Sequence, residues 1–268
     1  MQFQNANFIV FESHLFKTTS TVVQTEDCII VVDPTWLPRE VAEIRGYVEK
    51  IKGHRPVYLV LTHGDWDHVL GYGAFSDAIV IGSEALSQGR NRSQVLEQIT
   101  TFDDQYYLDR DYPLLYPKVD VIVRENGQVL EIGETTLTFY QANGHTDDGI
   151  FAIIDPLGLW IAGDYLSDVE FPYIYYNSTT YEHTLEKANA ILANHDVRFL
   201  IPGHGHIAET HSEIYRRSQE SVRYIRELRR AMISGADASY LLHGYSYRTS
   251  MHNFHEENMK LISKELAR

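Results

Sequence analysis

The stretch THGDWDH at residues 62–68 decides how the rest of the chain is interpreted. It directly follows the apolar run VYLVL, which predicts a buried strand. Four side chains able to bind a cation therefore leave one strand end together. In an extended segment, positions two apart point to the same side, so His63, Asp65 and Asp67 can converge while His68 lies on the other flank. This spacing predicts a metal site.

An alternative interpretation treats the same stretch as a polar turn between a strand and a helix. In that case Asp67 would cap a helix that starts near His68. A lone His-x-Asp pattern is usually explained in this way. Two histidines and two aspartates packed this closely favour metal binding, because imidazole and carboxylate are common ligands of divalent metals.

The composition indicates an ordinary globular protein. The chain has 268 residues, 44% hydrophobic and 22% charged, enough for a sizeable core. Its net charge of −14 argues against nucleic acid as a partner. The single cysteine, Cys28, forms no intrachain disulfide, and neither a secretory signal nor a membrane-spanning run is visible. We therefore expect a cytoplasmic protein with a small-molecule substrate and no membrane partner, and the sequence leaves a homodimer open.

The first half of the chain alternates predicted strands and helices, which is typical of a mixed sheet covered by helices. The predicted strands are residues 8–11, 21–24, 28–32, 57–61 and 79–81. The predicted helices are residues 40–51, 68–75 and 83–110, the last with a break near Gly89.

The second half begins with predicted hairpins. Asn126-Gly127 lies between the apolar runs 121–123 and 129–132, and such a turn is a strong hairpin signal. Further turns predict pairing of 129–132 with 135–140 and of 150–154 with 159–162. A strand at 199–201 and helices at 181–194, 212–233 and 252–266 complete the pattern. No repeat or low-complexity linker divides the chain, so we expect a single domain over residues 1–268.

Three later loops offer further metal ligands, each after a predicted strand. They are His145 in GHTDD, Asp164 in GD and His204 in PGHGH. A glycine precedes each one, so the backbone can turn sharply toward a crowded centre. Each signal alone is weak, but their recurrence after strands supports one shared site.

The succession THGDWDH, GHT, GD and PGHG resembles the metallo-β-lactamase-fold hydrolase superfamily over about residues 8–210. The resemblance implies an α/β (α+β) fold, the four-layer αββα sandwich, with a helical C-terminal extension over 211–268. It also implies a two-metal site at one edge of the sheets. Carried over by position, the ligands are His63, Asp65 and His145 for the first metal, Asp67, His68 and His204 for the second, and Asp164 as the bridge.

The activity implied by the resemblance is hydrolysis of an ester, thioester, lactone or related bond by a hydroxide that bridges the metals. Asp67 is the candidate catalytic residue, because it would orient this hydroxide or transfer its proton. Tyr173, Tyr175 and Tyr176 follow Asp164 in the sequence and favour an aromatic lid or core patch over direct catalysis. The insert at 83–118 is expected to wall the pocket.

Asp65 departs from the superfamily pattern, since most members carry histidine there. A carboxylate hardens the first site, so iron or manganese becomes plausible beside zinc. Two divalent ions give +4, and Asp65, Asp67, Asp164 and a hydroxide give −4, so the centre would be formally neutral. Members with a carboxylate there include diiron flavoproteins, which makes an oxidoreductase the runner-up. Phosphodiester hydrolysis also stays open, because the ligand set does not separate substrates.

Two further predictions concern residues near the site. The arginine-rich segment 212–233 has glutamates at helical spacing, which predicts a solvated helix face. His206 and His211 could support the ligands from behind.

Overall fold

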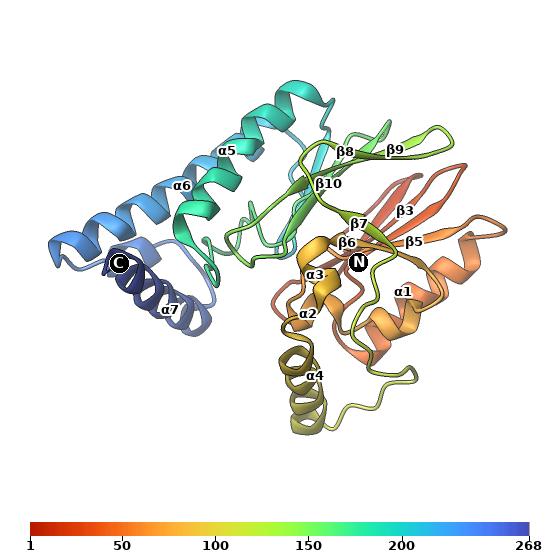
Figure 1. Ribbon diagram of the computed structural model, residues 1–268, viewed down its shortest axis with the longest axis horizontal. Helices are drawn as coiled ribbons and strands as arrows, with labels where there is room; N and C mark the ends of the chain where they lie inside the picture. The colour runs from red at the N-terminus through yellow and green to blue at the C-terminus, as the bar shows by residue number, and fades with distance from the viewer. Residues whose placement is uncertain (268) are drawn as a thin grey trace.

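The computed structural model describes residues 1–267 and holds two β-sheets with helices on their outer faces (Figure 1). One apolar cluster lies between the sheets and includes Val10, Ile30 and Phe139. A second cluster joins the outer face of the first sheet to α1, α2 and α4, and a third joins the second sheet to α5, α6 and α7. These layers confirm the predicted αββα sandwich.

The first sheet has seven strands in sequential order and changes from antiparallel to parallel pairing after β4. Helices α1 to α4 connect the parallel strands β4 to β7. The strands are β1 (Phe3–Gln4), β2 (Phe8–Glu12), β3 (Thr19–Gln24), β4 (Ile29–Val32), β5 (Val57–Val60), β6 (Ile79–Ser83) and β7 (Val121–Val123).

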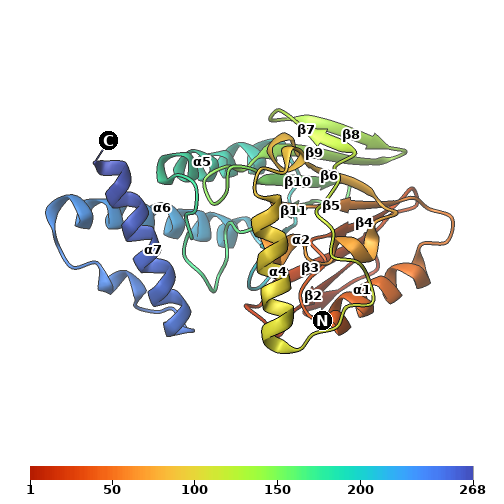
Figure 2. The same cartoon turned by 60° about the horizontal axis from the view of Figure 1, so that its bottom comes forward.

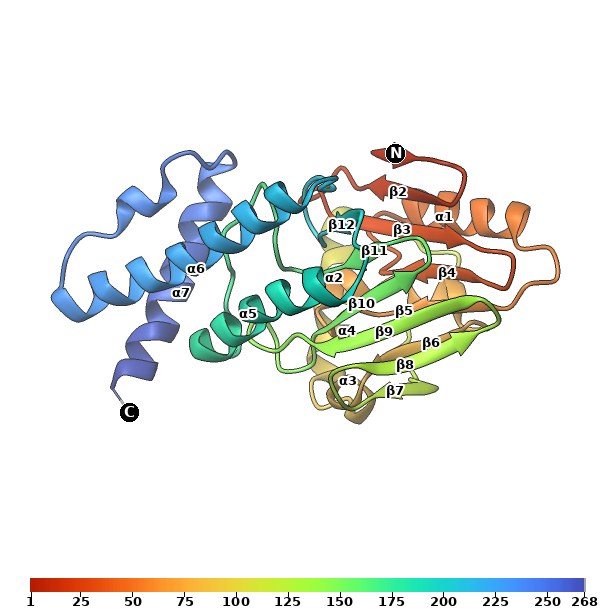
Figure 3. The same ribbon diagram turned by 90° about the horizontal axis from the view of Figure 1, so that it is seen from above.

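The second sheet has five strands in the order β12-β11-β10-β9-β8. Only β11 and β12 are parallel, and the helix between them, α5, lies beside this sheet (Figure 3). The strands are β8 (Gln128–Ile132), β9 (Thr135–Gln141), β10 (Ile150–Asp155), β11 (Leu159–Ile161) and β12 (Phe199–Ile201). The predicted hairpins β8–β9 and β10–β11 are confirmed.

The helices begin and end at recognisable signals. The α-helices are α1 (Pro38–Ile51), α2 (Trp66–Val69), α3 (Glu84–Gln88), α4 (Arg92–Tyr106), α5 (Ser178–Asn194), α6 (His211–Ser234) and α7 (Arg248–Leu266), with 3-10 turns η1 (Tyr72–Phe75) and η2 (Ser239–Leu242). The Thr210 hydroxyl caps α6, and Gly235, with φ at +71°, ends it. In the described residues, no helix is long and apolar enough to cross a bilayer.

The predicted hairpin across Asn126-Gly127 is wrong. β7 pairs with β6 in the seven-stranded sheet, whereas β8 belongs to the five-stranded sheet, so the turn passes from one sheet to the other. Hydrogen bonds of the Gln128 side chain replace the backbone bonds of a hairpin. This side chain accepts from the Arg124 N–H (2.8 Å) and donates to the Ile122 carbonyl (2.9 Å). The Asn-Gly signal therefore identified the turn but not the partner strand.

Two further expectations need correction. The helix after β5 begins at Trp66, with Asp65 at the N-cap position, so Asp67 lies inside the helix and does not cap it. On α6, Arg217 is only 3% exposed and donates to the carbonyls of Leu166 and His206. The solvated-face interpretation of this helix is therefore wrong at Arg217, which anchors the helix to the loops beneath it.

Candidate metal centre

The predicted ligands lie on four loops that meet at one end of the two sheets. Backbone hydrogen bonds tie these loops together: Ile150 N–H donates to the Thr62 carbonyl (2.8 Å), and Gly203 N–H donates to the Gly163 carbonyl (2.6 Å). A Cβ at Gly203 would overlap Oδ1 of Asp164. Only glycine at position 203 lets that carboxylate come so close to the backbone.

Two of the three close groups of ligand-type atoms match the ligand sets that the resemblance implies, and we call them the two triads. In the first, Nε2 of His145 lies 3.2 Å from Oδ2 of Asp65, and Nε2 of His63 lies 3.8 Å from the same oxygen. The atoms of this triad all lie within 4.8 Å of one another. Such spacing leaves room for one cation between three ligands.

The second triad is built in the same way around Asp67. Oδ2 of Asp67 lies 3.5 Å from Nε2 of His68 and 3.7 Å from Nε2 of His204. These three atoms also lie within 4.8 Å of one another. The structure thus separates the two triads as the resemblance implied.

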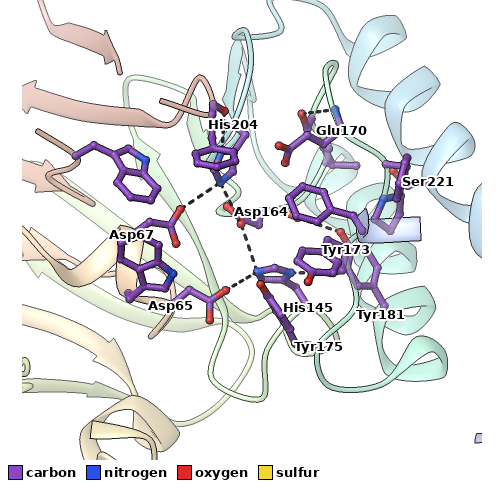
Figure 4. A pocket seen from close by; sticks show the side chains of 18 residues that line it. Asp65, Asp67, His145, Asp164, Glu170, Tyr173, Tyr175, Tyr181, His204 and Ser221 are labelled. Carbon is purple, nitrogen blue, oxygen red and sulfur yellow. Dashed lines mark hydrogen bonds and ion pairs between the residues drawn. The ribbon is translucent and has the colours of Figure 1, made fainter. Parts of the chain in front are cut away.

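Asp164 lies between the triads (Figure 4). Its Oδ1 is 3.1 Å from Nε2 of His68, and its Oδ2 is 3.3 Å from Nε2 of both His145 and His204 and 3.8 Å from Nε2 of His63. One carboxylate therefore faces all four imidazoles, which is the position of a bridging ligand.

Hydrogen bonds behind two of the histidines fix their tautomers. Nδ1 of His145 bonds to the Tyr173 carbonyl (2.6 Å), and Nδ1 of His204 bonds to the Phe16 carbonyl (2.9 Å). A carbonyl oxygen only accepts, so Nδ1 carries the proton and the lone pair of Nε2 faces the centre. This is the usual support for a metal-binding histidine.

Several of these inward-facing atoms are buried and have no hydrogen-bond partner among the described residues. They are Nε2 of His63, His68 and His145 and Oδ1 of Asp164. Burying a polar atom without a partner is costly. A metal ion bound at each triad would give all of these atoms a partner. The residues therefore fit a pair of divalent metal ions.

Asp33, which the sequence analysis did not single out, supports both triads from behind. It is 2% exposed and accepts from Thr62 N–H (2.9 Å), Thr62 Oγ1 (2.5 Å) and His68 Nδ1 (2.9 Å). The Thr62 hydroxyl donates its one proton to Asp33, so it accepts from Nδ1 of His63, 2.9 Å away. Asp33 directly follows β4, which is parallel to β5, the strand before His63.

The electrostatics of the cluster favour positive charge at its centre. Burial raises the pKa of Asp164, but His204, His68 and His63 together hold it well below its usual range. Burial lowers the pKa of His145, but Asp164 and other carboxylates raise it well above its usual value. Carboxylates that draw protons onto buried imidazoles would equally draw a divalent cation to the same place.

His206 and His211 lie outside the cluster. The exposed His206 pairs through Nδ1 with Asp168 (2.8 Å), and Nε2 of His211 bonds to the Val197 carbonyl (2.8 Å). Neither contacts a ligand histidine in the described part of the chain. The expectation that they support the ligands is therefore wrong, and the residues that do so include Asp33 and Thr62.

The family comparison agrees with this geometry. The family model for the metallo-β-lactamase superfamily matches residues 15–236. The chain belongs to this superfamily. The match extends beyond the predicted 8–210 and takes in all of α6, so the first helix of the extension is part of the shared fold.

Solved structures of the superfamily share the fold at low sequence identity. A metallo-β-lactamase family protein from Thermus thermophilus aligns with a TM-score of 0.66 at 17% identity, covering 96% of this chain and 94% of its own. An archaeal superfamily protein from Sulfolobus tokodaii aligns at 0.58 and 15%, covering 97% and 100%. The sec-alkyl sulfatase PisA1 aligns at 0.62 and 8%, covering 81% and 40%. The comparison with curated proteins finds no match.

A cavity of about 210 Å³ opens over the triads, and Asp65, Asp67 and Asp164 line it. Tyr173 and Tyr175 also line it, whereas Tyr176 does not. Residues 83–118 do not line this cavity itself. They line a neighbouring hollow that also reaches Asp65 and Tyr175, so the predicted wall lies beside the site there.

The C-terminal helix α7 crosses α6 (Figure 2) and supplies Phe254 to the lining of this cavity. The buried Asn258 accepts from the Ile174 N–H (2.8 Å) and donates to the Pro172 carbonyl (2.6 Å). Phe254, from the same helix, stacks on Tyr173 with ring centroids 4.3 Å apart. The extension thus holds the loop that carries the cavity's tyrosines, a role that no motif in the sequence indicated.

Two more carboxylates near the site went unrecognised in the sequence. Glu170 lines the cavity, and burial raises its pKa above its ordinary value. Asp148 lines the neighbouring hollow beside Gly64, and burial raises its pKa to about 6. Neither belongs to a triad.

Proposed function

We propose that this superfamily member is a hydrolase that uses two divalent metal ions on an ester, thioester or lactone bond of a small molecule. The observation that carries the proposal is the set of buried, unpartnered imidazole nitrogens on both sides of Asp164. Zinc fits the imidazole ligands, while the carboxylate of Asp65 makes iron or manganese suitable for the first triad.

Bound metals of this kind lower the pKa of a water toward ~7 and polarise the carbonyl under attack. The chain supplies the rest. Asp67 borders the cavity with its side chain 14% exposed, which suits it to orient the attacking water or to move its proton. Asp164 would hold the two halves of the centre at a fixed separation. The aromatic walls restrict water above the reacting bond.

An oxidoreductase is the second candidate, because Asp65 gives the first triad a hard oxygen ligand. Phosphodiester hydrolysis gains no support from the cavity, since no lysine or arginine of the described chain lines it. The single-domain organisation, the cytoplasmic location, the small-molecule partner and a homodimer stay predictions.

The test combines metal analysis with two activity assays. Protein prepared without chelator and offered zinc, iron and manganese should bind two metal equivalents and hydrolyse members of an ester, thioester and lactone panel. Asp164→Ala should lose both properties, while the exposed control Asp196→Asn should keep them. Oxygen consumption with a reductant, together with silence across the panel when both metals are present, would favour the oxidoreductase.

A further inference from the structure

Two groups of aromatic side chains line the cavity over the triads. In one group, Trp36 packs edge-on against Trp66, with ring centroids 4.6 Å apart. In the other, Tyr173 lies 4.3 Å from both Tyr175 and Phe254 between ring centroids. Sites that bind organic cations are commonly lined by aromatic rings, and this cavity has such a lining.

The charged side chains of the cavity add to this preference. Glu170 lines it and directs its carboxylate toward the side on which His204 and Asp164 lie (Figure 4). Only its backbone N–H is bonded, to Ser167 Oγ (3.1 Å), and its carboxylate makes no hydrogen bond or ion pair within residues 1–267. No lysine or arginine in that range lines the cavity. The carboxylate of Glu170 therefore lies half-buried in the cavity, with no lysine or arginine of the described residues paired to it.

We propose that the cavity binds the ammonium end of an organic-cation substrate, with Glu170 as the specificity-determining residue. The inference rests on the proposed hydrolytic function, because the bond to be cleaved would lie over the triads beside the cation. The cavity's volume of about 210 Å³ suits a compact group such as trimethylammonium. Glu170 would repel an anionic substrate, and no lysine or arginine of the described residues lines the cavity to offset that repulsion.

The first experiment measures binding alone. Trp36 and Trp66 line the cavity, so their fluorescence reports occupancy, while the third tryptophan, Trp160, does not line it. Tetramethylammonium should change this fluorescence at concentrations where the neutral tert-butanol does not. Glu170→Gln should weaken the ammonium binding about tenfold, or about 1.4 kcal/mol. Glu43→Gln, which removes an exposed carboxylate of α1, should leave it unchanged.

The second experiment compares esters that differ only in charge. Acetylcholine and 3,3-dimethylbutyl acetate have the same shape, so their ratio of kcat/KM isolates the cation. We expect wild type to prefer acetylcholine at least about tenfold, mainly through KM, and Glu170→Gln to remove most of that preference. Glu170→Lys should reverse it.

The outcomes separate this inference from the proposed function. Equal hydrolysis of both esters would overturn the inference and leave the hydrolase standing. Ammonium binding that depends on Glu170, without hydrolysis of any ester, would support the inference and count against the function. If Glu170→Gln does not fold, as judged by circular dichroism, the two wild-type comparisons still decide. Failure of wild type to distinguish the charged probe from the neutral one overturns the inference.

Discussion

The two triads differ in what stands behind their histidines. In the first, a hydroxyl supports His63 and the Tyr173 carbonyl supports His145. In the second, the carboxylate of Asp33 contacts His68 directly at 2.9 Å. The Asp65 side chain in the first triad is 27% exposed, against 14% for Asp67 in the second.

This difference predicts unequal metal affinity. A carboxylate behind a histidine makes the imidazole a stronger donor than a neutral acceptor does. The second triad should therefore bind its metal more tightly, and the first should exchange its metal more readily with solvent. Two similar ligand sets in one fold thus give one site that holds its metal tightly and one site, which we call the adjustable site, that exchanges its metal.

The largest expected effect comes from Asp164→Asn, which weakens the one ligand that the triads share. Both metals should bind poorly, and hydrolysis should fall about a thousandfold, on the scale of the several kcal/mol that bound metals contribute. Elemental analysis and kcat/KM measure the two results. The exposed Asp196→Asn is the control. Loss of one metal only would mean that Asp164 does not bridge.

Removing one carboxylate from each triad comes next. Asp65→Ala should leave one tightly held metal equivalent, in the second triad, whereas Asp67→Ala should leave one weakly held equivalent in the first. The reason is that each carboxylate serves a single triad. Titration with a chelator measures both the stoichiometry and the affinity. Two tightly held metals in Asp65→Ala would show that Asp65 is not a ligand.

A smaller loss of metal affinity is expected when a residue that hydrogen-bonds to a ligand histidine is changed instead of a ligand. Asp33→Asn should weaken metal binding at both triads by about 10- to 100-fold, because Asp33 contacts His68 directly and His63 through Thr62. Thr62→Val should weaken mainly the first triad, since it removes the link to His63 but leaves the direct contact of Asp33 with His68 in place. Stepwise zinc titration of the two variants distinguishes these patterns. Equal effects of Thr62→Val on both triads would refute the proposed chain of hydrogen bonds.

The same contrast explains what could be predicted from the sequence. Most strands and the seven candidate ligands follow from local signals: apolar runs, glycine turns, and histidine or aspartate at strand ends. The four layers were implied by the family resemblance that these motifs carry. Asp33 was missed because its role depends on β4 lying parallel to β5, and no local pattern states which strands are neighbours. The turn at Asn126-Gly127 was assigned to a hairpin for the same reason.

The cavity was harder to predict than the ligands. Its walls come from segments far apart in the chain, including Trp36 before α1 and Phe254 on α7. Glu170 follows no motif, and its significance lies in the lack of a partner, which only the packed structure shows. Features that depend on packing between distant segments of the chain produce no periodic pattern in the sequence, so they could not be predicted from it.

The smallest expected effect tests whether the first triad is the adjustable one. Asp65→His replaces a hard oxygen ligand by a softer nitrogen and adds one formal positive charge, so metal preference at the first triad should shift toward zinc by roughly tenfold over manganese. The fold should persist, because Asp65 lies at a helix N-cap where its side chain makes no capping bond. Competition of zinc against iron and manganese, in wild type and variant, measures the shift. The second triad should keep its preference, because Asp67, His68 and their support from Asp33 are unchanged. A shift at both triads would mean that the two sites act as one electrostatic unit through Asp164, and that their unequal supports do not make them independent.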